Sequence, residues 1–308
     1  MTISKIPFNL NNAKQQDFLR ACKDPQFTHI AYIGGRGSGK TTALCRVFLE
    51  AVDLYPGIRL ALTAESYPKL KDSTLRAFLD MLHAGNIDHE YHRTDEIISF
   101  STGSQILFRS HDNPDRLRGP EFAFIGIDEA RNTSEAAYLV SVGELRQAGF
   151  PHKIIIATTP RGSRHWSAKY FINAATRLPN SIAIRASSYD NAENLPQNYI
   201  PMLESTYTGS FARQEIYGDL VIPSGLVYDA FNPSLHVIPS IVEGPPSSAS
   251  SAKSADKKSL IYCGLDFGTR HPVAAIWLAV PPSGELTVID EYKRGGLSAD
   301  IHAREILA

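Results

Sequence analysis

The sequence predicts an α/β fold in which a parallel sheet is covered by helices on both faces. Apolar runs of strand length alternate with helix-like runs between residues 29 and 184, and this alternation is typical of a parallel sheet. A glycine-rich turn follows the first strand, and a later strand ends in two adjacent acidic residues. A helix-like run begins directly after the glycine-rich turn, so the pattern favours a fold assembled from strand–loop–helix units.

The elements of this fold can be assigned in chain order up to residue 218. Residues 96–100 and 105–109 alternate apolar and polar side chains around a turn that contains glycine, which predicts an inserted β-hairpin. Residues 197–218 have a helical pattern and end the unit. The remaining strands are expected at residues 29–33, 59–63, 122–127, 153–157 and 181–184, and the helices at residues 13–21, 41–54, 68–83, 134–148 and 164–176.

The composition of the chain changes after a first domain that we place at residues 1–222. Residues 223–258 form the expected linker, and its low-complexity part from residue 244, rich in Pro, Ser and Lys, is typical of a mobile segment. Fifty residues with two or three strands bury too little apolar surface to fold alone, so residues 259–308 are expected to begin a truncated second domain. Its strands are expected at residues 259–265, 272–280 and 285–290, with a helix from residue 301.

The overall composition is that of a soluble globular protein. The chain has 308 residues, of which 43% are hydrophobic and 20% are charged, with no apolar run long enough to span a bilayer and no signal-peptide pattern at residues 1–10. Cys22, Cys45 and Cys263 are widely spaced and odd in number, so we expect reduced thiols in a cytoplasmic protein. The formal net charge of -1 means that any contact with nucleic acid depends on local basic patches.

The segment from Gly34 to Thr41 has the pattern G-x-x-x-x-G-K-T of a phosphate-binding P-loop, and it lies between a strand and a helix, as this motif requires. Its glycines let backbone N–H groups point at a phosphate, and the following helix presents its unpaired N–H groups to the same anion. We expect Lys40 to reach the β- and γ-phosphates and Thr41 to place its hydroxyl on Mg²⁺. The expected nucleotide-binding residues of the loop are Gly34, Gly35, Arg36, Gly37, Ser38, Gly39, Lys40 and Thr41.

An apolar strand that starts at Phe122 ends in Asp128 and Glu129. In P-loop ATPases such a strand delivers one carboxylate to the Mg²⁺ shell, and in one large class a second carboxylate polarises the attacking water. We expect Asp128 to bind the metal ion and Glu129 to polarise the attacking water. The pair indicates an enzyme that hydrolyses ATP to drive another process, and it argues against a small-molecule kinase. A strand between the P-loop strand and the Asp-Glu strand is the arrangement of the additional-strand, catalytic-glutamate ATPases.

A third strand of interest ends in Thr158 and Thr159. Because it follows the two motifs above in the order found in helicase-like motors, we interpret its end as lying beside the γ-phosphate and sensing hydrolysis. The alternative is a plain strand end at the Pro160–Gly162 turn.

Four arginines are candidates for neutralising phosphate charge. Arg36 lies inside the P-loop and could contact a phosphate in its own subunit. Arg109, Arg116 and Arg118 precede the Asp-Glu strand, and the last two lie in a turn-rich segment that suits an arginine finger offered to a neighbouring subunit. Salt bridges to nearby acids, or a solvated loop position for Arg36, are the alternatives.

Two glutamines, Gln15 and Gln16, precede the P-loop strand, with Phe8 and Phe18 nearby. A glutamine amide can read the edge of adenine through its paired donor and acceptor, and an aromatic ring can stack on the base. The alternative is an ordinary polar surface on a short helix.

Three histidines, His83, His89 and His92, cluster before the hairpin. Their spacing fits no common zinc pattern, so we interpret them as solvated residues of a connection.

One carboxylate of the second domain occupies a position that nucleases use. Asp266 ends a strand, where two-metal nucleases hold one of their carboxylates. Asp290 and Glu291 end a nearby strand and could approach it, but one carboxylate is not a site, and a plain strand end is the alternative.

These motifs, in this order, resemble the large terminase subunit of tailed bacteriophages. The matching segments are residues 34–41, 113–119, 124–130, 157–162, 263–268 and 272–276. The resemblance implies an N-terminal ATPase domain of the RecA/helicase-like type and a C-terminal RNase H-like nuclease domain that cuts concatemeric DNA. It implies ATP and Mg²⁺ as cofactors, and Mg²⁺ or Mn²⁺ for a complete nuclease.

The resemblance also assigns residues. Lys40, Asp128 and Glu129 match the family's ATPase residues, and Gln15 matches the adenine-reading position. Arg36, with Arg118 or Arg116, matches the charge-neutralising arginines. Asp266 matches the first nuclease acid. The other nuclease acids of the family lie beyond residue 308, so the nuclease is expected to be inactive in this chain.

A large terminase is a motor that moves double-stranded DNA through a portal into a procapsid. The implied partners are double-stranded DNA, the portal protein and the small terminase subunit, without a membrane. We expect a homo-oligomeric ring on the portal, a monomer in dilute solution, and a location in the host cytoplasm outside the mature virion. The alternatives are a helicase or DNA-repair ATPase, which usually has a second motor-like domain, and a nucleotide-gated scaffold, which does not need Glu129.

Overall fold

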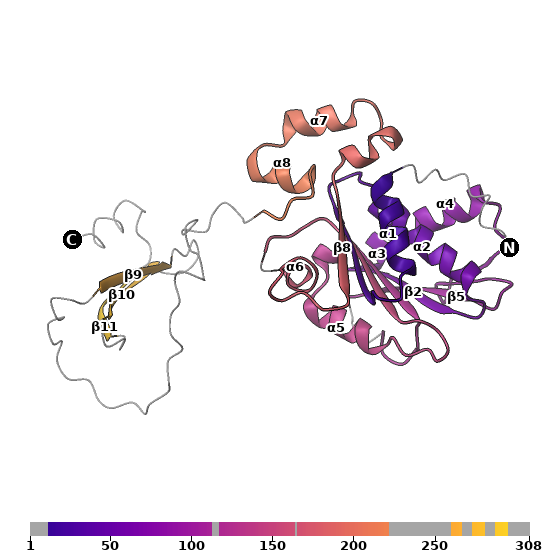
Figure 1. Cartoon of the computed structure of the whole chain (residues 1–308), viewed down its shortest axis with the longest axis horizontal. Helices are drawn as coiled ribbons and strands as arrows, with labels where there is room; N and C mark the ends of the chain where they lie inside the picture. Colours follow the sequence, from indigo (N-terminus) through magenta and orange to yellow (C-terminus); the bar gives the residue numbers. More distant parts are fainter. Residues whose placement is uncertain are drawn as a thin grey trace. The chain divides into compact units, whose positions relative to one another are not determined.

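The chain divides into two compact units, Met1–Phe231 and Asn232–Ala308 (Figure 1). The computed structural model describes residues 12–112, 117–163, 165–221, 260–266, 273–280 and 287–294. The linker expected at 223–258, its low-complexity segment and the helix expected from residue 301 lie outside the described residues. No helix in the described ranges combines the length and the apolar character that crossing a membrane requires.

Eight described strands of the first unit form one sheet, in the order β3-β4-β5-β2-β6-β7-β1-β8. The strands from β5 to β8 in this order pair in parallel, whereas β3 and β4 add an antiparallel edge. The predicted α/β class with a mainly parallel sheet is therefore confirmed. The strands are β1 (His29–Gly34), β2 (Arg59–Ala64), β3 (Glu90–His92), β4 (Ile97–Ser99), β5 (Gln105–Ser110), β6 (Phe124–Asp128), β7 (Lys153–Thr158) and β8 (Ser181–Ala186).

Strand β7 lies between the glycine-loop strand β1 and the acid-ended strand β6. On one side Ala157 of β7 pairs with Tyr32 of β1, and on the other side it pairs with Asp128 of β6. Parallel strands end at the same edge of a sheet, so the loop after β1, the acids after β6 and the threonines after β7 meet there. Along the chain it is β2 that separates β1 from β6, but in space it is β7.

Helices cover both faces of this sheet (Figure 1). Helix α1 (Ala13–Lys23), helix α2 (Lys40–Leu54) and helix α4 (Arg76–Ala84) pack on one face over a large apolar core. Helix α5 (Glu135–Gly143) and helix α6 (Trp166–Phe171) pack on the other face over a smaller core.

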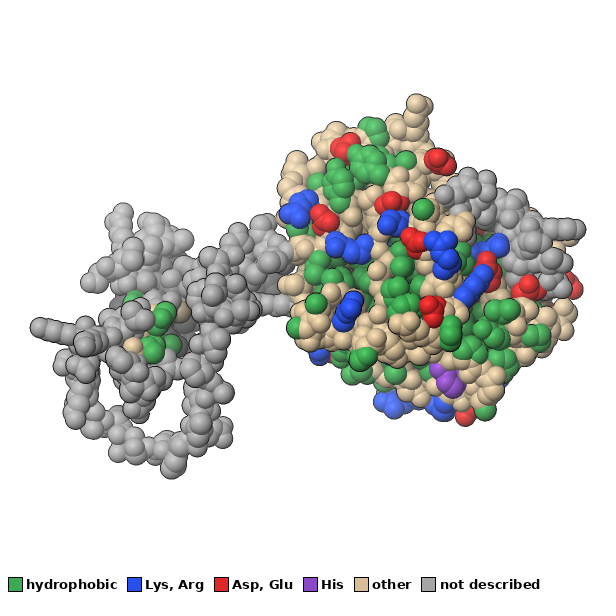
Figure 2. All heavy atoms as spheres, viewed as in Figure 1, with side chains coloured by type: hydrophobic (Ala, Val, Ile, Leu, Met, Phe, Trp, Pro, Cys, Tyr) green, Lys and Arg blue, Asp and Glu red, His purple; other side chains and the backbone are tan. Residues whose placement is uncertain are grey.

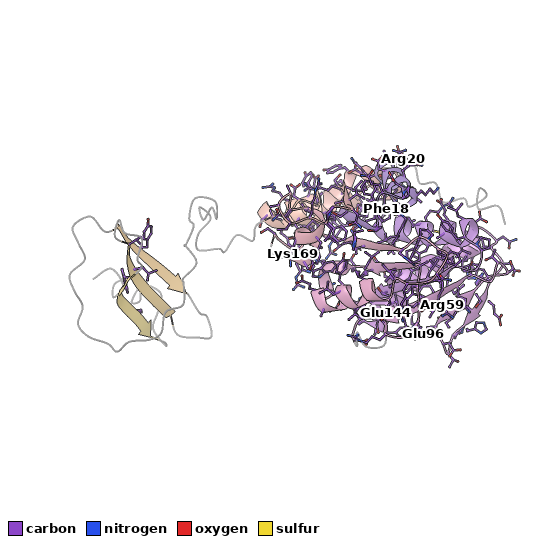
Figure 3. The ribbon with its side chains drawn as sticks, turned by 60° about the horizontal axis from the view of Figure 1, so that its bottom comes forward. Phe18, Arg20, Arg59, Glu96, Glu144 and Lys169 are labelled. Carbon is purple, nitrogen blue, oxygen red and sulfur yellow. The ribbon has the colours of Figure 1, made fainter. Side chains whose placement is uncertain are left out.

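Helix α1 shows the amphipathic pattern that holds such a helix against the sheet. Phe18 is fully buried and its ring meets that of Tyr32 edge-on, at 5.2 Å between ring centroids. Arg20, two residues further on, points outward and pairs with Asp17 (Figure 3). Asn12 caps the helix by accepting hydrogen bonds from the backbone N–H groups of Lys14 and Gln15. The predicted helix at 13–21 is therefore confirmed and two residues longer.

Several other predicted helices are shorter or divided in the structure. The helix expected at 134–148 ends at Gly143, because Leu145 then pairs with Phe122 as an isolated β-bridge. The helix expected at 164–176 is only α6. The helical segment at 197–218 is two helices, α7 (Tyr199–Thr206) and α8 (Gly209–Glu215), because Tyr207 and Thr208 have extended backbone angles.

The helix expected at 68–83 contains an irregular turn. It begins as the short helix α3 (Tyr67–Leu70), continues as the π-helix η2 (Lys71–Leu75) and ends as α4. The hairpin that follows is present, because β4 pairs antiparallel with β5. Strand β3, which pairs with β4, was not predicted. It has only three residues, too few to show the alternation of apolar and polar side chains that indicates a strand.

The described part of the second unit is a three-stranded antiparallel sheet in the order β11-β10-β9. Its strands are β9 (Leu260–Asp266), β10 (Val273–Val280) and β11 (Thr287–Arg294). All three predicted strands are present, although β11 extends beyond the predicted end at residue 290. In the register of this sheet Asp266 pairs with Ala274, Asp290 with Trp277 and Glu291 with Ile276.

Candidate active site

The glycine-rich loop wraps around the start of helix α2. Gly37 and Gly39 have φ angles of 71° and 80°, in the left-handed region that glycine enters without steric cost. A Cβ atom at Gly35 would lie 2.2 Å from the backbone carbonyl oxygen of Ile216, so the loop also requires glycine for space. Two side chains that follow β8 hold the loop: Ser188 donates to the carbonyl of Arg36 at 2.6 Å and Asn191 to that of Gly37 at 2.7 Å.

Lys40 folds back over the loop that precedes it. Its Nζ donates to the carbonyl oxygens of Gly34 at 3.1 Å and Gly35 at 2.8 Å, and only 6% of the residue is exposed. Burial lowers the pKa of Lys40, although the carboxylates of Glu129 and Asp128 act in the opposite direction. The lysine head group therefore lies inside the loop that is predicted to hold the phosphates.

Asp128 is the centre of a hydrogen-bonded group at the end of β6. Thr41 lies 3.2 Å and 3.0 Å from its two carboxylate oxygens, and Thr74 of η2 donates to Oδ2 at 2.7 Å. The backbone N–H of Glu129 donates to Oδ1 at 3.0 Å. Burial and the neighbouring Glu129 raise the pKa of Asp128, while the hydrogen bonds from Thr74 and Thr41 act to lower it.

Glu129 lines the same cleft as Lys40 and Thr41. Its φ angle of 47° is in the left-handed region, which a residue with a side chain occupies only at a cost of order 1 kcal/mol. Such strained residues gather at functional sites, and here the turn places the carboxylate in the cleft instead of along the strand.

A buried carboxylate, Glu215 of α8, joins two arginines at the cleft. Arg36 donates from Nε to its Oε2 at 2.8 Å, and Arg131 donates to its Oε1 at 2.7 Å. Burial alone raises the pKa of Glu215, but the hydrogen bonds from Arg131, Arg36 and Gln214 outweigh it and lower the pKa to about 2. The loop, the segment after β6 and helix α8 are thereby tied together at one carboxylate.

The threonine-ended strand contacts the segment that follows the acid pair. The backbone N–H of Arg131 donates to Oγ1 of Thr158 at 2.8 Å, and Arg161 donates to the carbonyl of Arg131 at 2.9 Å. Thr159 lines the cleft, whereas Thr158 is fully buried behind it. The end of β7 therefore contacts both the cleft, through Thr159, and the segment that follows the acid pair, through Thr158.

The elements enclose a cleft of about 1050 Å³. Gln15 reaches it from α1, and its Nε2 donates to the carbonyl of Gly39 at 2.9 Å. Its Oε1 is buried and has no hydrogen-bond partner in the described part of the chain. The cleft is lined by Gln15, Arg36, Gly37, Gly39, Lys40, Thr41, Thr42, Glu129, Arg131, Asn132, Thr159, Asn191, Asn194, Leu195, Tyr199, Phe211 and Glu215.

Residues that line the cleft, together with the adjoining Asp128, fit a magnesium-bound nucleotide. Hydroxyl and carboxylate oxygens, as supplied by Thr41 and Asp128, are the ligands that Mg²⁺ prefers. The unpartnered Oε1 of Gln15 offers an acceptor of the kind that an adenine amino group needs. The backbone N–H groups at the start of α2 suit a phosphate.

Other predicted residues lie away from the cleft. Phe18 is packed in the core against Tyr32, so the suggestion that it stacks on a base is wrong. Arg109 donates to the carbonyls of Asp95 and Phe108 within its own hairpin region and is not among the cleft-lining residues.

Arg118 is exposed and does not line the cleft, while Arg116 and Phe8 lie outside the described residues. The rings of His83 and His89 lie 6.0 Å apart and His92 faces Glu90. Within the described ranges, no group of three or more His, Cys, Asp or Glu residues could hold a metal ion. Cys22 and Cys45 are buried free thiols.

Several residues of the site were not predicted. Arg131 lies only two residues after Glu129 and could have been noticed for that reason. Thr74 interrupts the apolar face of a predicted helix, which was also a usable signal. Glu215 gave no local signal, because its partner Arg36 is 179 positions away in the sequence.

Comparison with known proteins agrees with this geometry. A family profile described as "Phage terminase large subunit" matches residues 26–218. The chain is 23% identical over 300 residues to the terminase large subunit of Escherichia phage T5, covering 96% of this chain and 66% of that protein. It is 23% identical over 306 residues to the PBSX phage terminase large subunit of Bacillus subtilis (strain 168), covering 91% of this chain and 67% of that protein.

Solved structures of the same kind share the fold. The large terminase of a thermophilic bacteriophage, solved in complex with ADP, has a TM-score of 0.61 at 20% identity, over 96% of this chain and 72% of that one. The ATPase domain of the Thermus phage P74-26 large terminase has a TM-score of 0.51 at 18% identity, over 66% of this chain and 93% of that one. The chain spans about two thirds of the length of the curated relatives. Because the family profile covers most of the first unit, the chain belongs to the phage terminase large subunit family.

Proposed function

We propose that this chain hydrolyses ATP to drive double-stranded viral DNA into a procapsid. The observation that carries the proposal is that Lys40, Thr41 and Glu129 line one cleft and that the buried Asp128 is hydrogen-bonded to Thr41, although these residues come from two separate motifs. Hydrolysis requires a phosphate cradle, a metal-holding carboxylate and a base for water, and these residues supply all three.

Each residue of this group has a distinct role in the proposal. Lys40 leaves the carbonyls of Gly34 and Gly35 and pairs with the phosphates, where its positive charge is needed. Thr41 and Asp128 hold Mg²⁺ through their oxygens, and this ion, when bound, supplies positive charge to the phosphate oxygens. Glu129 accepts the proton of the attacking water.

The two arginines bound to Glu215 are suited to respond to nucleotide. Arg36 is half exposed, and its ion pair with Glu215 must open before its guanidinium reaches a phosphate.

Arg118 or Arg116 is proposed to neutralise charge in the site of a neighbouring subunit. Gln15 reads the adenine edge through the oxygen that is now unpartnered, and Thr158 and Thr159 transmit the hydrolysis state through Arg131.

The second unit is proposed to begin an RNase H-like nuclease domain. Three antiparallel strands with Asp266 at the end of β9 support this assignment. The proposed activity of a nuclease domain of this kind is the cutting of concatemeric DNA with Mg²⁺ or Mn²⁺, and Asp266 would be one of the carboxylates that hold the metal ions. We propose domain limits of 1–222 for the ATPase, 223–258 for the linker and 259–308 for the start of the nuclease.

The proposed partners are double-stranded DNA, the portal protein and the small terminase subunit, in the host cytoplasm and without a membrane. The chain works as a homo-oligomeric ring on the portal and is a monomer in dilute solution. Figure 2 shows basic and acidic side chains interspersed on the visible face of the first unit, which supports contact with DNA through selected basic residues and not through a uniform field.

The test is ATP turnover of the wild-type chain with and without double-stranded DNA and portal protein. The proposal predicts magnesium-dependent turnover that rises when both partners are added. Turnover that is absent under every condition, or that responds to single-stranded DNA alone, would contradict it and the second result would favour a helicase.

A further inference from the structure

The π-helix η2 places one polar side chain against the metal-binding carboxylate. Residues of the α3–η2–α4 segment that face the core are spaced by up to four positions, and all but one of them are apolar: Leu70, Thr74, Leu75, Phe78, Met81 and Leu82. Thr74 is the exception, and it is only 1% exposed. Burying a hydroxyl group in an apolar core costs free energy unless the group forms a hydrogen bond. The side chain of Thr74 must therefore have a hydrogen-bond partner inside the protein.

The partner of Thr74 is Asp128, at 2.7 Å from Oγ1 to Oδ2. This hydrogen bond is shorter than either contact of Asp128 with Thr41, at 3.0 Å and 3.2 Å. A threonine hydroxyl has a single proton, so Thr41 can donate to only one carboxylate oxygen at a time. Thr74 therefore supplies a donor to Oδ2 that does not depend on Thr41.

The π-turn is the structural device that brings this hydroxyl into place. Single π-turns within α-helices are rare and frequently occur at functional sites. Lys71, Asp72 and Ser73 are exposed while Thr74 and Leu75 are buried, so the wide turn changes from solvent to core at Thr74. The backbone carbonyl of Thr74 also accepts a hydrogen bond from Sγ of Cys45 at 3.7 Å, which fixes the turn against helix α2.

We propose that Thr74 is a positioning residue that holds Asp128 in the orientation that receives Mg²⁺. The inference rests on the proposed magnesium-nucleotide site and adds a residue from a third segment to it. Thr74 does not line the cleft, and in this proposal it acts only through its hydrogen bond with the carboxylate of Asp128. Partners of metal ligands in this position typically change metal affinity or activity by about 10- to 100-fold when removed.

The test compares Thr74→Val, which removes the hydroxyl at similar volume, with Thr74→Ser, which keeps it. One measurement is the affinity for ADP with Mg²⁺ and with EDTA by calorimetry, which reports metal linkage without turnover. The other is the Mg²⁺ concentration that gives half-maximal ATP hydrolysis. Thr63→Val is a matched control, because Thr63 is equally buried but donates to the carbonyl of Gly126 at 2.9 Å.

The proposal predicts that Thr74→Val raises the half-maximal Mg²⁺ concentration by about tenfold and reduces the Mg²⁺-dependent gain in ADP affinity. ADP affinity in EDTA stays unchanged, and Thr74→Ser and Thr63→Val retain wild-type metal dependence. If Thr74→Val does not fold, Thr74→Ala is measured in its place and the same shift is expected.

Two outcomes overturn the inference. One is wild-type magnesium dependence in the folded hydroxyl-free variant, and the other is an equal loss in Thr74→Ser. If the wild-type chain itself gains no ADP affinity from Mg²⁺, the proposed magnesium-nucleotide site fails first. A gain in ADP affinity from Mg²⁺ that is present in the wild type and unchanged in Thr74→Val would instead reject only the role of Thr74.

Discussion

Arg36 donates its Nε hydrogen to Oε2 of Glu215 at 2.8 Å, which joins the phosphate-binding loop to helix α8. The side chain of Glu215 is only 1% exposed, whereas that of Arg36 is 55% exposed. The carboxylate is thus the fixed member of the pair and the arginine is the member able to turn toward a ligand. Arg131 holds the second oxygen of the same carboxylate, so Glu215 keeps a charged partner when Arg36 leaves.

Glu215→Gln is expected to destabilise the chain most at neutral pH. The pKa of Glu215 is lowered from 4.5 to about 2 in the folded state. A carboxylate with a lowered folded-state pKa contributes stability above its unfolded pKa, and this contribution is lost as the pH falls toward the folded pKa. The shift corresponds to at most about 3 kcal/mol, because solvent screens the half-exposed Arg36. Thermal unfolding of both proteins from pH 7 down to pH 3 checks this.

The difference in stability between wild type and Glu215→Gln should be constant from pH 7 to about pH 5 and then shrink. Glu144→Gln is the matched control, because Glu144 is also buried but, among the described residues, forms its ion pair with one arginine, Arg146, outside the cleft. A difference that grows as the pH falls would contradict the assignment.

Lys40→Ala is expected to weaken ATP binding by about 10- to 100-fold, because charge-assisted hydrogen bonds to the phosphates are lost. Turnover should fall to background. Equilibrium binding of a fluorescent ATP analogue measures the first effect. Lys69→Ala, which removes an exposed lysine paired with Glu65 outside the cleft, should bind as wild type does. Equal affinities in Lys40→Ala and wild type would mean that the lysine does not meet the phosphates.

Activity is expected to depend on neighbouring subunits if Arg116 or Arg118 is an arginine finger. Specific activity should rise with protein concentration or when portal protein and DNA are present. A finger that acts in trans is worth roughly 10³- to 10⁵-fold in rate. Mixing Arg118→Ala with Lys40→Ala subunits should restore turnover that neither has alone. If single variants at both arginines keep full turnover under assembled conditions, the finger is another residue.

Asp266→Ala is expected to abolish metal-dependent cutting of double-stranded DNA by a protein that carries the complete nuclease domain. Two-metal cleavage needs several carboxylates, and Asp266 ends strand β9, where such nucleases hold one of them. Cleavage of linear double-stranded DNA with Mg²⁺ or Mn²⁺ measures this effect, and ATP turnover should persist in the variant. Cutting by Asp266→Ala at the wild-type rate would contradict the assignment of Asp266.

The regular part of the fold could be predicted from local sequence. Five parallel strands were expected outside the hairpin, and all five are present between His29 and Ala186. They could be recognised because buried parallel strands are near-continuous apolar runs. The glycine loop and the acid pair were recognisable because a phosphate and a metal constrain residue types at fixed spacing. The predicted and observed ends of a helix differed where contacts with a distant segment end it. Helix α5 stops at Gly143, because Leu145 then pairs with Phe122.

The contacts that organise the site could not be predicted in the same way. The ion pair of Arg36 with Glu215 joins residues 179 positions apart, and no local pattern encodes it. The hydrogen bond of Thr74 with Asp128 depends on a π-turn, which has no sequence period of its own. Phe18 illustrates the reverse error: an aromatic residue near a predicted base site is buried in the core.

Glu129 is proposed to activate the attacking water, so the decisive measurement is single-turnover hydrolysis by Glu129→Gln. An amide cannot accept the proton of water, so single-turnover hydrolysis of Mg-ATP should fall by about 10²- to 10⁴-fold. Affinity for Mg-ATP should stay near that of wild type, since Lys40, Thr41 and Asp128 are intact. Glu135→Gln, which changes an acid on helix α5 outside the cleft, should hydrolyse at the wild-type rate. Hydrolysis by Glu129→Gln at the wild-type rate would show that Glu129 does not activate the water.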